Sequence, residues 1–174
     1  ISADAGTVDF DGHRISDMTE AERAQLRLRE FGFVFQFGQL LPDLIAVDNV
    51  AVPLMLAGMG RREAEDAARA ELDELGVGPI AGKYPGEMSG GEAQRGAVAR
   101  ALVSRPRVLF ADEPTGSLDS LAAEQVMDMM TGVARDGGTT VVLVTHDPRT
   151  ASYAQREVVV RDGQITTGAV LSEA

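Results

Sequence analysis

The stretch MSGGEAQR, from Met88 to Arg95, and the stretch VLFADEP, from Val108 to Pro114, decide the fold class of this chain. The first places a Ser-Gly-Gly turn at the start of a helix, where exposed N–H groups and the helix dipole attract an anion. The second ends an apolar strand in two carboxylates, at the position where ligands of α/β sheets collect. Nucleotide chemistry needs both parts, and together they indicate an α/β fold.

A phosphate loop of the form GxxxxGK[ST] does not occur in the 174 residues. The only lysine, Lys83, lies in the segment AGKYP. Val77 stands where the first loop glycine should be, and Tyr84 stands where Ser or Thr should be. The Lys83 segment is therefore not a phosphate loop.

The composition is that of one ordinary globular domain, with 44% hydrophobic and 25% charged residues. The formal charge of −11 argues against nucleic acid as a partner, because backbone binding needs clustered Lys and Arg. The absence of cysteine fits a reducing, cytoplasmic compartment. The longest apolar stretch, 50–60, is well short of the ~20 residues that span a bilayer. Residues 1–12 do not resemble a signal peptide, and we expect them to come from the middle of a domain.

Short apolar runs along the chain predict strands, and the first of them is closed by a turn at Asp11-Gly12. The runs after Pro106 predict the strands of a parallel sheet. The runs after Pro106 lack polar alternation, which is typical of strands covered on both faces. We expect strands at 7–10, 32–35, 108–111, 141–144 and 158–160.

Segments with helical periodicity lie between the predicted strands. A capping-box pattern at Thr19 precedes a helix at 20–29. We assign residues 1–35 and 106–174 to the α/β core of the fold, and residues 36–105 to a helical subdomain. Further helices are expected from Asp48, over 61–75, from the Ser-Gly-Gly turn and over 121–135.

Ser89, Gly90 and Gly91 are candidate phosphate contacts. The serine hydroxyl and the backbone N–H groups lie at a helix start, with no side chain to block an anion. An isolated Ser-Gly-Gly sequence is more often a flexible capped turn. The flanking Glu92 and Arg95, with the acidic pair downstream, favour the phosphate contact.

Asp112 and Glu113 are candidates for metal-assisted hydrolysis. Asp112 suits the capture of Mg²⁺. Glu113 suits a general base that orients or deprotonates water attacking a γ-phosphate. The alternative is an acidic turn that Pro114 forces at the end of the strand.

His146 and Gln36 also follow strands. His146 can hydrogen-bond a γ-phosphate and hold the base in place, whereas Gln36 can reach metal and water through its amide oxygen. The alternatives are a structural cap for His146 and an exposed loop residue for Gln36. Asp119, in the turn 116–119, either caps the next helix or contacts a partner subunit.

The segment after Gln36 is crowded with apolar side chains. They form either the core of the helical insert or a docking surface for another helix. These residues are Leu40, Leu41, Pro42, Leu44, Ile45 and Val47.

Taken together, the segments resemble the nucleotide-binding subunit of ATP-binding-cassette (ABC) transporters. MSGGEAQR is similar to the family's signature, VLFADEP to its Walker B strand, VFQFGQLLP to its Q-loop, GSLD to its D-loop and VTHD to its switch-histidine loop. The order and spacings fit from about residue 6 to residue 168. QFGQLLPDLIAVDNVAVPL and ADEPTGSLD look most similar to the subgroup of lipoprotein release, macrolide export and cell division.

The resemblance implies a P-loop NTPase-like ATPase core that uses ATP and Mg²⁺. It implies catalytic roles for Glu113, His146 and Gln36, with Asp112 and Gln36 at the metal. It implies a head-to-tail dimer with a second ATPase subunit and a transmembrane permease partner at the inner face of the cell membrane. The residues implied to contact ATP across that dimer are Ser89, Gly90, Gly91, Glu92 and Asp119.

Two departures from the family are mild, because Met88 and Glu92 replace the usual Leu and Gln while the glycines stay. The family also places its Walker A loop before the segment that begins here. We therefore expect the P-loop strand and helix to be missing, catalysis by the chain alone to be negligible, and the chain to be a fragment. The alternatives are a non-catalytic module that lends its signature face to a complete partner, or an ABC protein of translation or DNA repair.

Overall fold

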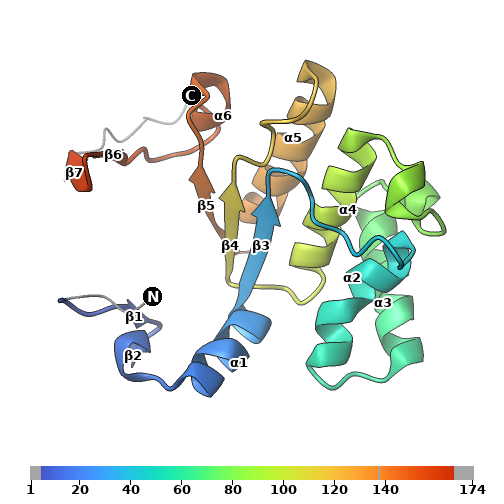
Figure 1. Cartoon of the computed structure of the whole chain (residues 1–174), viewed down its shortest axis with the longest axis horizontal. Coiled ribbons are helices and arrows are strands. Elements are labelled where there is room, and N and C mark those ends of the chain that lie inside the picture. The colour runs from blue at the N-terminus through green and yellow to red at the C-terminus, as the bar shows by residue number, and fades with distance from the viewer. Residues whose placement is uncertain (1–4, 137, 167–174) are drawn as a thin grey trace.

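The computed structural model describes residues 5–136 and 138–166. Within these residues, β3 (Phe31–Phe35), β4 (Val108–Asp112) and β5 (Thr140–Val144) form a parallel sheet in the order β3-β4-β5. Figure 1 shows helices α4 (Gly90–Leu102) and α5 (Ser120–Asp136) beside this sheet, with α2 and α3 beyond α4. The predicted α/β fold with a parallel sheet and a helical insert is confirmed.

The other elements are the helices of the insert, the 11-residue helix that precedes β3, and several short strands, helices and turns. They are β1 (Asp9–Phe10), β2 (His13–Arg14), α1 (Glu20–Glu30), α2 (Ala46–Leu56), α3 (Arg61–Glu74), α6 (Pro148–Ala151), β6 (Val159–Arg161) and β7 (Gln164–Thr166), with single 3-10 turns at Ile15–Asp17, Gly78–Ile80 and Pro85–Glu87. None of the described helices is both long enough and apolar enough to pass through a lipid bilayer.

The register of the sheet brings its strand ends to one edge. Phe35 pairs with Asp112, and Asp112 pairs with Val144. Gln36 and Glu113 therefore come one residue after the ends of adjacent strands. Polar residues that are far apart in the sequence meet at this edge for that reason.

One face of the sheet packs closely against α4 and α5. Gly32 of β3 permits the close approach of α4, because a Cβ atom there would lie 2.5 Å from the carbonyl oxygen of Ala101. The fully or almost fully buried side chains of this core are Val34, Val98, Leu102, Leu109, Ala111, Val126 and Met130.

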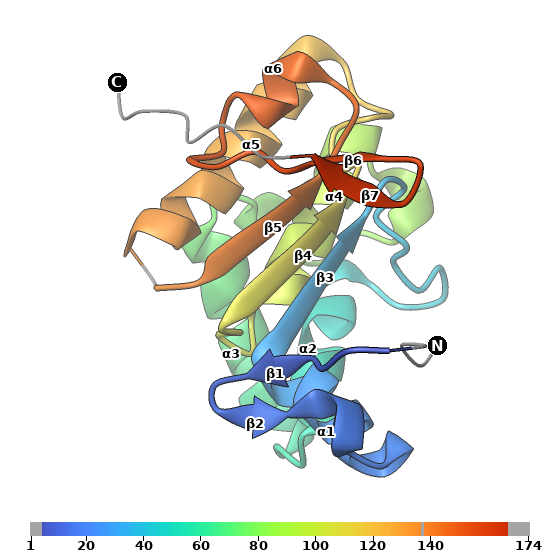
Figure 2. The ribbon, with the colours of Figure 1, turned by 90° about the vertical axis from the view of Figure 1, so that its left-hand side faces the viewer.

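The opposite face of the sheet is largely uncovered within the described residues, as Figure 2 shows. Phe35, Val142 and Val144 on this face are 37%, 40% and 57% exposed. Phe31, near the amino end of the sheet, makes an edge contact with Phe10. The expected covering of both faces is therefore wrong for these residues. The runs are apolar on both faces, so periodicity does not distinguish the covered face from the open one.

The strands expected at 7–10 and 158–160 lie outside the parallel sheet. β1 pairs antiparallel with β2, and β6 pairs antiparallel with β7. Each pair turns through an Asp-Gly dipeptide in left-handed backbone, Asp11-Gly12 and Asp162-Gly163. Asp-Gly is a strong signal for a two-residue hairpin. At 158–160 this signal should have outweighed the apolar run, and assigning that run to the parallel sheet was wrong.

The helical insert has its own core, and α4 contributes to it as well as to the sheet core. Its buried residues include Ala46, Val47, Val50, Ala51, Ala64, Ala68, Leu72, Ala99 and Val103. Asn49 of α2 is fully buried and accepts a hydrogen bond from the N–H of Leu41 at 2.7 Å while donating to the carbonyl of Leu44 at 2.9 Å. The apolar segment after Gln36 is thus divided, because Val47 lies in the core and Leu41 is exposed.

Candidate functional site

Glu113 and His146 meet at the carboxyl edge of the sheet. His146 Nδ1 lies 2.6 Å from Glu113 Oε1, and the backbone N–H of His146 donates to the same oxygen at 2.9 Å. The Glu113 side chain is 22% exposed, whereas that of His146 is 89% exposed. Of the four polar residues predicted at the strand ends, these two are in direct contact. We call Gln36, Asp112, Glu113 and His146 the strand-end cluster.

The contact couples the protonation of the two side chains. Burial acts to raise the pKa of Glu113, but hydrogen bonds from His146 and Thr145 outweigh it and the pKa is lowered. The hydrogen bond to Glu113 and the charge of its carboxylate raise the pKa of His146. A protonated imidazole donates through both nitrogens, so one nitrogen can bind Glu113 while the other reaches an anion.

The backbone of Glu113 is held in an unusual conformation. Its φ is 46°, in the left-handed region that few non-glycine residues adopt. Its N–H donates to the carbonyl of Val144 at 2.9 Å, and Pro114 behind it is fully buried. Such conformations persist where the surrounding structure enforces them, and they cluster at functional sites.

Asp112 and Gln36 lie beside this pair at the same edge. Asp112 ends β4 and is exposed on the uncovered face of the sheet. Gln36 lies against the next turn, because its carbonyl accepts the Ser117 hydroxyl at 2.9 Å and its amide nitrogen would be 3.0 Å from a Cβ atom at Gly116. Within residues 5–136 and 138–166, no hydrogen bond joins Gln36 to Asp112 or Glu113.

The residues present are compatible with Mg²⁺ that is held mainly by substrate and water. No group of three or more His, Cys, Asp or Glu side chains within the described part of the chain is arranged to hold a metal. Mg²⁺ usually keeps several waters and binds through one or two carboxylates together with phosphate oxygens. The exposed Asp112 carboxylate suits that mode, with the amide oxygen of Gln36 as the other candidate ligand.

The second candidate region is the turn Ser89–Glu92, which we call the signature turn. Ser89 caps α4 in a reciprocal capping box: its hydroxyl accepts the N–H of Glu92 at 3.2 Å, and its N–H donates to Glu92 Oε2 at 2.8 Å. The N–H groups of Gly90 and Gly91 have no acceptor among the described residues. They point from a helix start and are available to an anion.

Glu92 and Asp119 already have structural partners. Glu92 Oε1 accepts Lys83 Nζ at 2.7 Å, and this bond, with the backbone hydrogen bond from Ser89, lowers the pKa of Glu92 to about 2. Asp119 accepts the N–H of Ala122 at 2.9 Å and so caps α5. Of the two alternatives for Asp119, the cap is the one that the structure shows.

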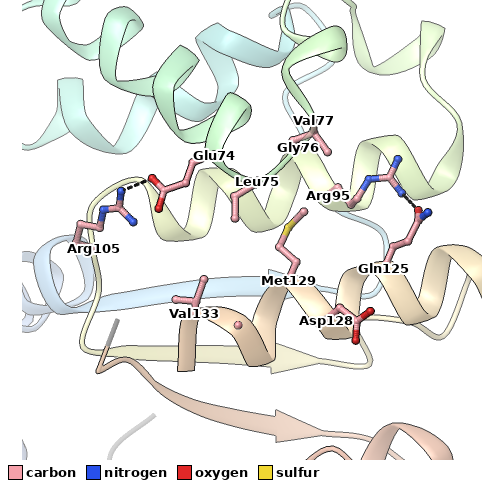
Figure 3. Close-up of a pocket in the computed structure, with 11 residues that line it drawn as sticks. Glu74, Leu75, Gly76, Val77, Arg95, Arg105, Gln125, Asp128, Met129 and Val133 are labelled. Atoms are coloured by element: carbon pink, nitrogen blue, oxygen red, sulfur yellow. Dashed lines mark hydrogen bonds and ion pairs between the residues drawn. The ribbon is translucent and has the colours of Figure 1, made fainter. Parts of the chain in front are cut away.

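The groove in Figure 3 is not the candidate site, although it is well formed. It has a volume of about 790 Å³ and lies between the end of α3, α4 and α5. Arg95 donates to Gln125 at 2.6 Å near one end, and Arg105 donates to Glu74 at 2.8 Å near the other. No residue of the strand-end cluster or the signature turn lines it. We therefore place the site where the Glu113 carboxylate and the His146 imidazole meet.

Sequence reasoning missed two residues with direct contacts to the predicted ones. Thr145 donates its hydroxyl to Glu113 Oε2 at 3.0 Å. Its place between a strand and His146 was the only available signal. Lys83 was noted only as the chain's single lysine, and its pairing with Glu92 depends on the fold of the insert.

Comparisons with known proteins agree with this geometry. A family model described as ABC transporter matches residues 1–116. The lipoprotein-releasing system ATP-binding protein LolD 2 of Caulobacter vibrioides is 46% identical over 93% of this chain and 71% of its own length. The macrolide export ATP-binding/permease protein MacB of Syntrophobacter fumaroxidans is 45% identical over 92% of this chain and 23% of its own length.

A solved structure has the same fold. The ATP-binding cassette MJ0796, determined as a dimer in a post-hydrolysis state bound to ADP and Pi, superposes with a TM-score of 0.88 and 32% identity. The alignment covers 100% of this chain and 77% of that one. With its Ser-Gly-Gly turn, its strand-end Asp-Glu pair and these similarities, the chain belongs to the ABC transporter family, as an ATP-binding cassette.

Proposed function

We propose that this cassette hydrolyses MgATP to drive a membrane permease of the lipoprotein-release or macrolide-export kind. The observation that carries the proposal is the Glu113–His146 pair at the carboxyl edge of the sheet, directly beside Asp112. The similarity to LolD and MacB proteins supports the type of transporter.

Each residue of the strand-end cluster has a role in this proposal. Glu113 accepts the proton of the water that attacks the γ-phosphate. His146 holds Glu113 through Nδ1 and hydrogen-bonds the γ-phosphate through Nε2. Asp112 and Gln36 hold Mg²⁺, which neutralises charge that develops on the phosphate oxygens.

In this proposal the signature turn contacts ATP that is bound by a second subunit. The N–H groups of Gly90 and Gly91, which have no acceptor within residues 5–136 and 138–166, form an anion-binding helix start together with the Ser89 hydroxyl. The dimeric form of the similar cassette MJ0796 supports a pairing of two such subunits, and we propose that this pairing is head-to-tail. In this pairing Glu92 and Asp119 act on nucleotide indirectly, because Glu92 shapes the turn and Asp119 caps the neighbouring helix.

The insert connects this chemistry to the permease. We propose that residues 36–105 form the helical subdomain and that 1–35 with 106–174 form the core. The exposed Phe37 and Leu41 beside Gln36 are suited to contact a helix of the permease at the inner face of the membrane. No GxxxxGK[ST] stretch occurs in the 174 residues, so we expect these residues by themselves to bind ATP weakly.

Substitution of the proposed base tests the function. In the full-length protein assembled with its membrane partner, Glu113→Gln should lower MgATP turnover by at least about 100-fold, because the amide does not accept the proton of water. ATP binding should be retained, because Glu113 does not hold the nucleotide. Steady-state phosphate release and nucleotide binding measure the two effects.

Asp128→Asn is the matched control, because Asp128 is an exposed carboxylate on α5 outside the strand-end cluster. It should leave turnover unchanged. Turnover by Glu113→Gln equal to the parent would show that Glu113 is not the base. ATP binding without turnover in the parent protein would favour the non-catalytic module.

A further inference from the structure

The side chain of Glu113 has more freedom than its backbone, and two groups restrict it. The left-handed φ of 46° and the bond from its N–H to Val144 fix the main chain. His146 occupies Oε1 through both its backbone N–H and Nδ1. The other oxygen, Oε2, receives a single hydrogen bond within the described residues, from the hydroxyl of Thr145 at 3.0 Å.

The proton of the Thr145 hydroxyl is directed toward Glu113. Thr145 Oγ1 accepts the backbone N–H of Asp147 at 3.1 Å. That bond occupies a lone pair of the hydroxyl oxygen, so the one O–H proton is free to point toward the carboxylate. Hydrogen bonds from a neutral donor to a charged acceptor are stronger than neutral ones, which favours this orientation.

Thr145 is itself held by a chain of hydrogen bonds that returns to the residues after Glu113. Asp147 caps α6 by accepting the N–H of Arg149 at 3.0 Å, and it also accepts the hydroxyl of Thr150 at 3.2 Å. Thr150 lies 3.0 Å, oxygen to oxygen, from Thr115. Thr150 and Thr115 are both buried, so water competes little for these bonds.

We infer that Thr145 is a positioning residue that holds the Glu113 carboxylate in one orientation for the reaction. The inference rests on the proposed role of Glu113 as the base. With His146 on one oxygen and Thr145 on the other, the carboxylate cannot rotate freely, and its remaining lone pairs keep a fixed direction. A base held in this way is already oriented for the attacking water, so its side chain does not have to change rotamer before the reaction.

Two substitutions at position 145 test the inference in the full-length protein assembled with its membrane partner. Thr145→Val keeps the shape but removes the donor, and turnover (kcat) should fall about tenfold with little change in KM for ATP. Thr145→Ser restores the hydroxyl and should restore kcat to within about twofold of the parent. Phosphate release over a range of ATP concentrations separates kcat from KM.

Thr139→Val is the matched structural control. Thr139 is buried, precedes the same strand and donates its hydroxyl to the carbonyl of Pro106 at 2.8 Å, at the end of β5 away from Glu113. This variant loses a buried hydrogen bond, so its Tm should fall while its kcat stays near that of the parent. If Thr145→Val proves unstable, Thr145→Ala takes its place in the same comparison with Thr145→Ser.

Failure of the inference and failure of the proposed function give different results. Parent-like kcat in Thr145→Val, together with loss of turnover in Glu113→Gln, would overturn the role of Thr145 and leave the proposed function intact. Equal losses of kcat in Thr145→Val and Thr145→Ser would also overturn it, because the hydroxyl would then not be the active group. Parent-like turnover in Glu113→Gln would overturn the proposed function itself.

Discussion

The strand-end cluster and the signature turn are built in opposite ways. The signature turn is local: Ser89 and Glu92 satisfy each other across one helical turn. The strand-end cluster is assembled from three separate strand ends, and the bond from Thr145 to Glu113 spans 32 residues of sequence. One region depends on a short pattern of residues, and the other depends on the whole sheet.

This difference determines how each region responds to change. A capping box forms wherever its sequence begins a helix, so it tolerates small movements of its surroundings. The strand-end cluster needs the register of β3, β4 and β5, because each strand supplies only one or two of its residues. We therefore expect disturbance of the sheet to damage the cluster before it damages the turn.

The largest expected effect comes from Gly32→Ala, which acts on both regions through the packing of β3 against α4. The new Cβ atom would lie 2.5 Å from the backbone oxygen of Ala101 and 2.9 Å from Leu109 Cδ1. Backbone cannot yield as a flexible side chain can, so we expect a loss of about 3 kcal/mol or more in the free energy of unfolding. Urea denaturation of the full-length protein measures it.

Gly132→Ala on α5 provides the contrast. Apart from the backbone of its own helix and its chain neighbours, no heavy atom would lie within 4 Å of a Cβ atom at Gly132, so this variant should be neutral or more stable by up to about 1 kcal/mol. A Gly32→Ala protein as stable as the parent would show that α4 can shift away from β3. The two candidate regions would then be less strongly coupled than the packing indicates.

The same contrast explains what could be predicted from the sequence. The capping box at Thr19 and the helix that begins at the Ser-Gly-Gly turn are predicted from local sequence alone, and both are confirmed. The capping box between Ser89 and Glu92 is not among these predictions. The order of the longer helices and of β3, β4 and β5 is also predicted, whereas the short elements β2, α6 and β7 are not. The contact of Thr145 with Glu113 did not follow, because it requires that β4 and β5 be neighbours in register.

The errors in the predicted sheet have a related cause. An apolar run predicts a strand but not its partner, so the run near Val159 was placed in the parallel sheet although it forms a hairpin with β7. The open face beside Asp112 could not be recognised either, because Phe35 and Val144 are as apolar as buried residues. Pairing and exposure are properties of the assembled fold, and a local pattern does not contain them.

A smaller effect should separate the two glycines of the signature turn. A Cβ atom at Gly91 would lie 2.9 Å from Cβ of Ala122, whereas one at Gly90 would have Leu118 Cδ2 at 3.8 Å as its nearest neighbour. Gly91→Ala should therefore cost about 1–3 kcal/mol of stability through overpacking against α5, and Gly90→Ala less than about 1 kcal/mol. Thermal and urea unfolding of the two variants test this difference.

Measurements of activity on Gly90→Ala and Gly91→Ala test the role of the turn in a second way. If both N–H groups bind phosphate, both alanine variants should raise KM for ATP in the assembled transporter, including the one that keeps its stability. A rise confined to Gly91→Ala would mean that only the packing of the turn matters. The signature turn would then be a structural cap, as an isolated Ser-Gly-Gly sequence usually is.

The smallest expected effect concerns Lys83, whose ion pair with Glu92 is not part of the capping box. Lys83 Nζ lies 2.7 Å from Glu92 Oε1, and both side chains are partly exposed. A double-mutant cycle of Lys83→Met and Glu92→Gln should give a coupling of about 0.5–1 kcal/mol at neutral pH. The exposed pair Arg61–Glu65 on α3, tested as Arg61→Met and Glu65→Gln, is the control, and its coupling should be weaker than that of Lys83 with Glu92.

The pH dependence of the same variants distinguishes a charge effect from a packing effect. The pKa of Glu92 is lowered to about 2 in the folded protein, against an ordinary value of 4.5. The carboxylate therefore contributes stability that is present above about pH 4.5 and is lost as the pH falls toward 2. The stability advantage of the parent over Glu92→Gln should shrink across that window. In a Lys83→Met background the pKa of Glu92 is lowered less, so the loss should be smaller and should be complete at a higher pH. An advantage that does not change with pH would mean that Glu92 acts only as a hydrogen-bond acceptor in the cap, and the signature turn would then be local in every respect.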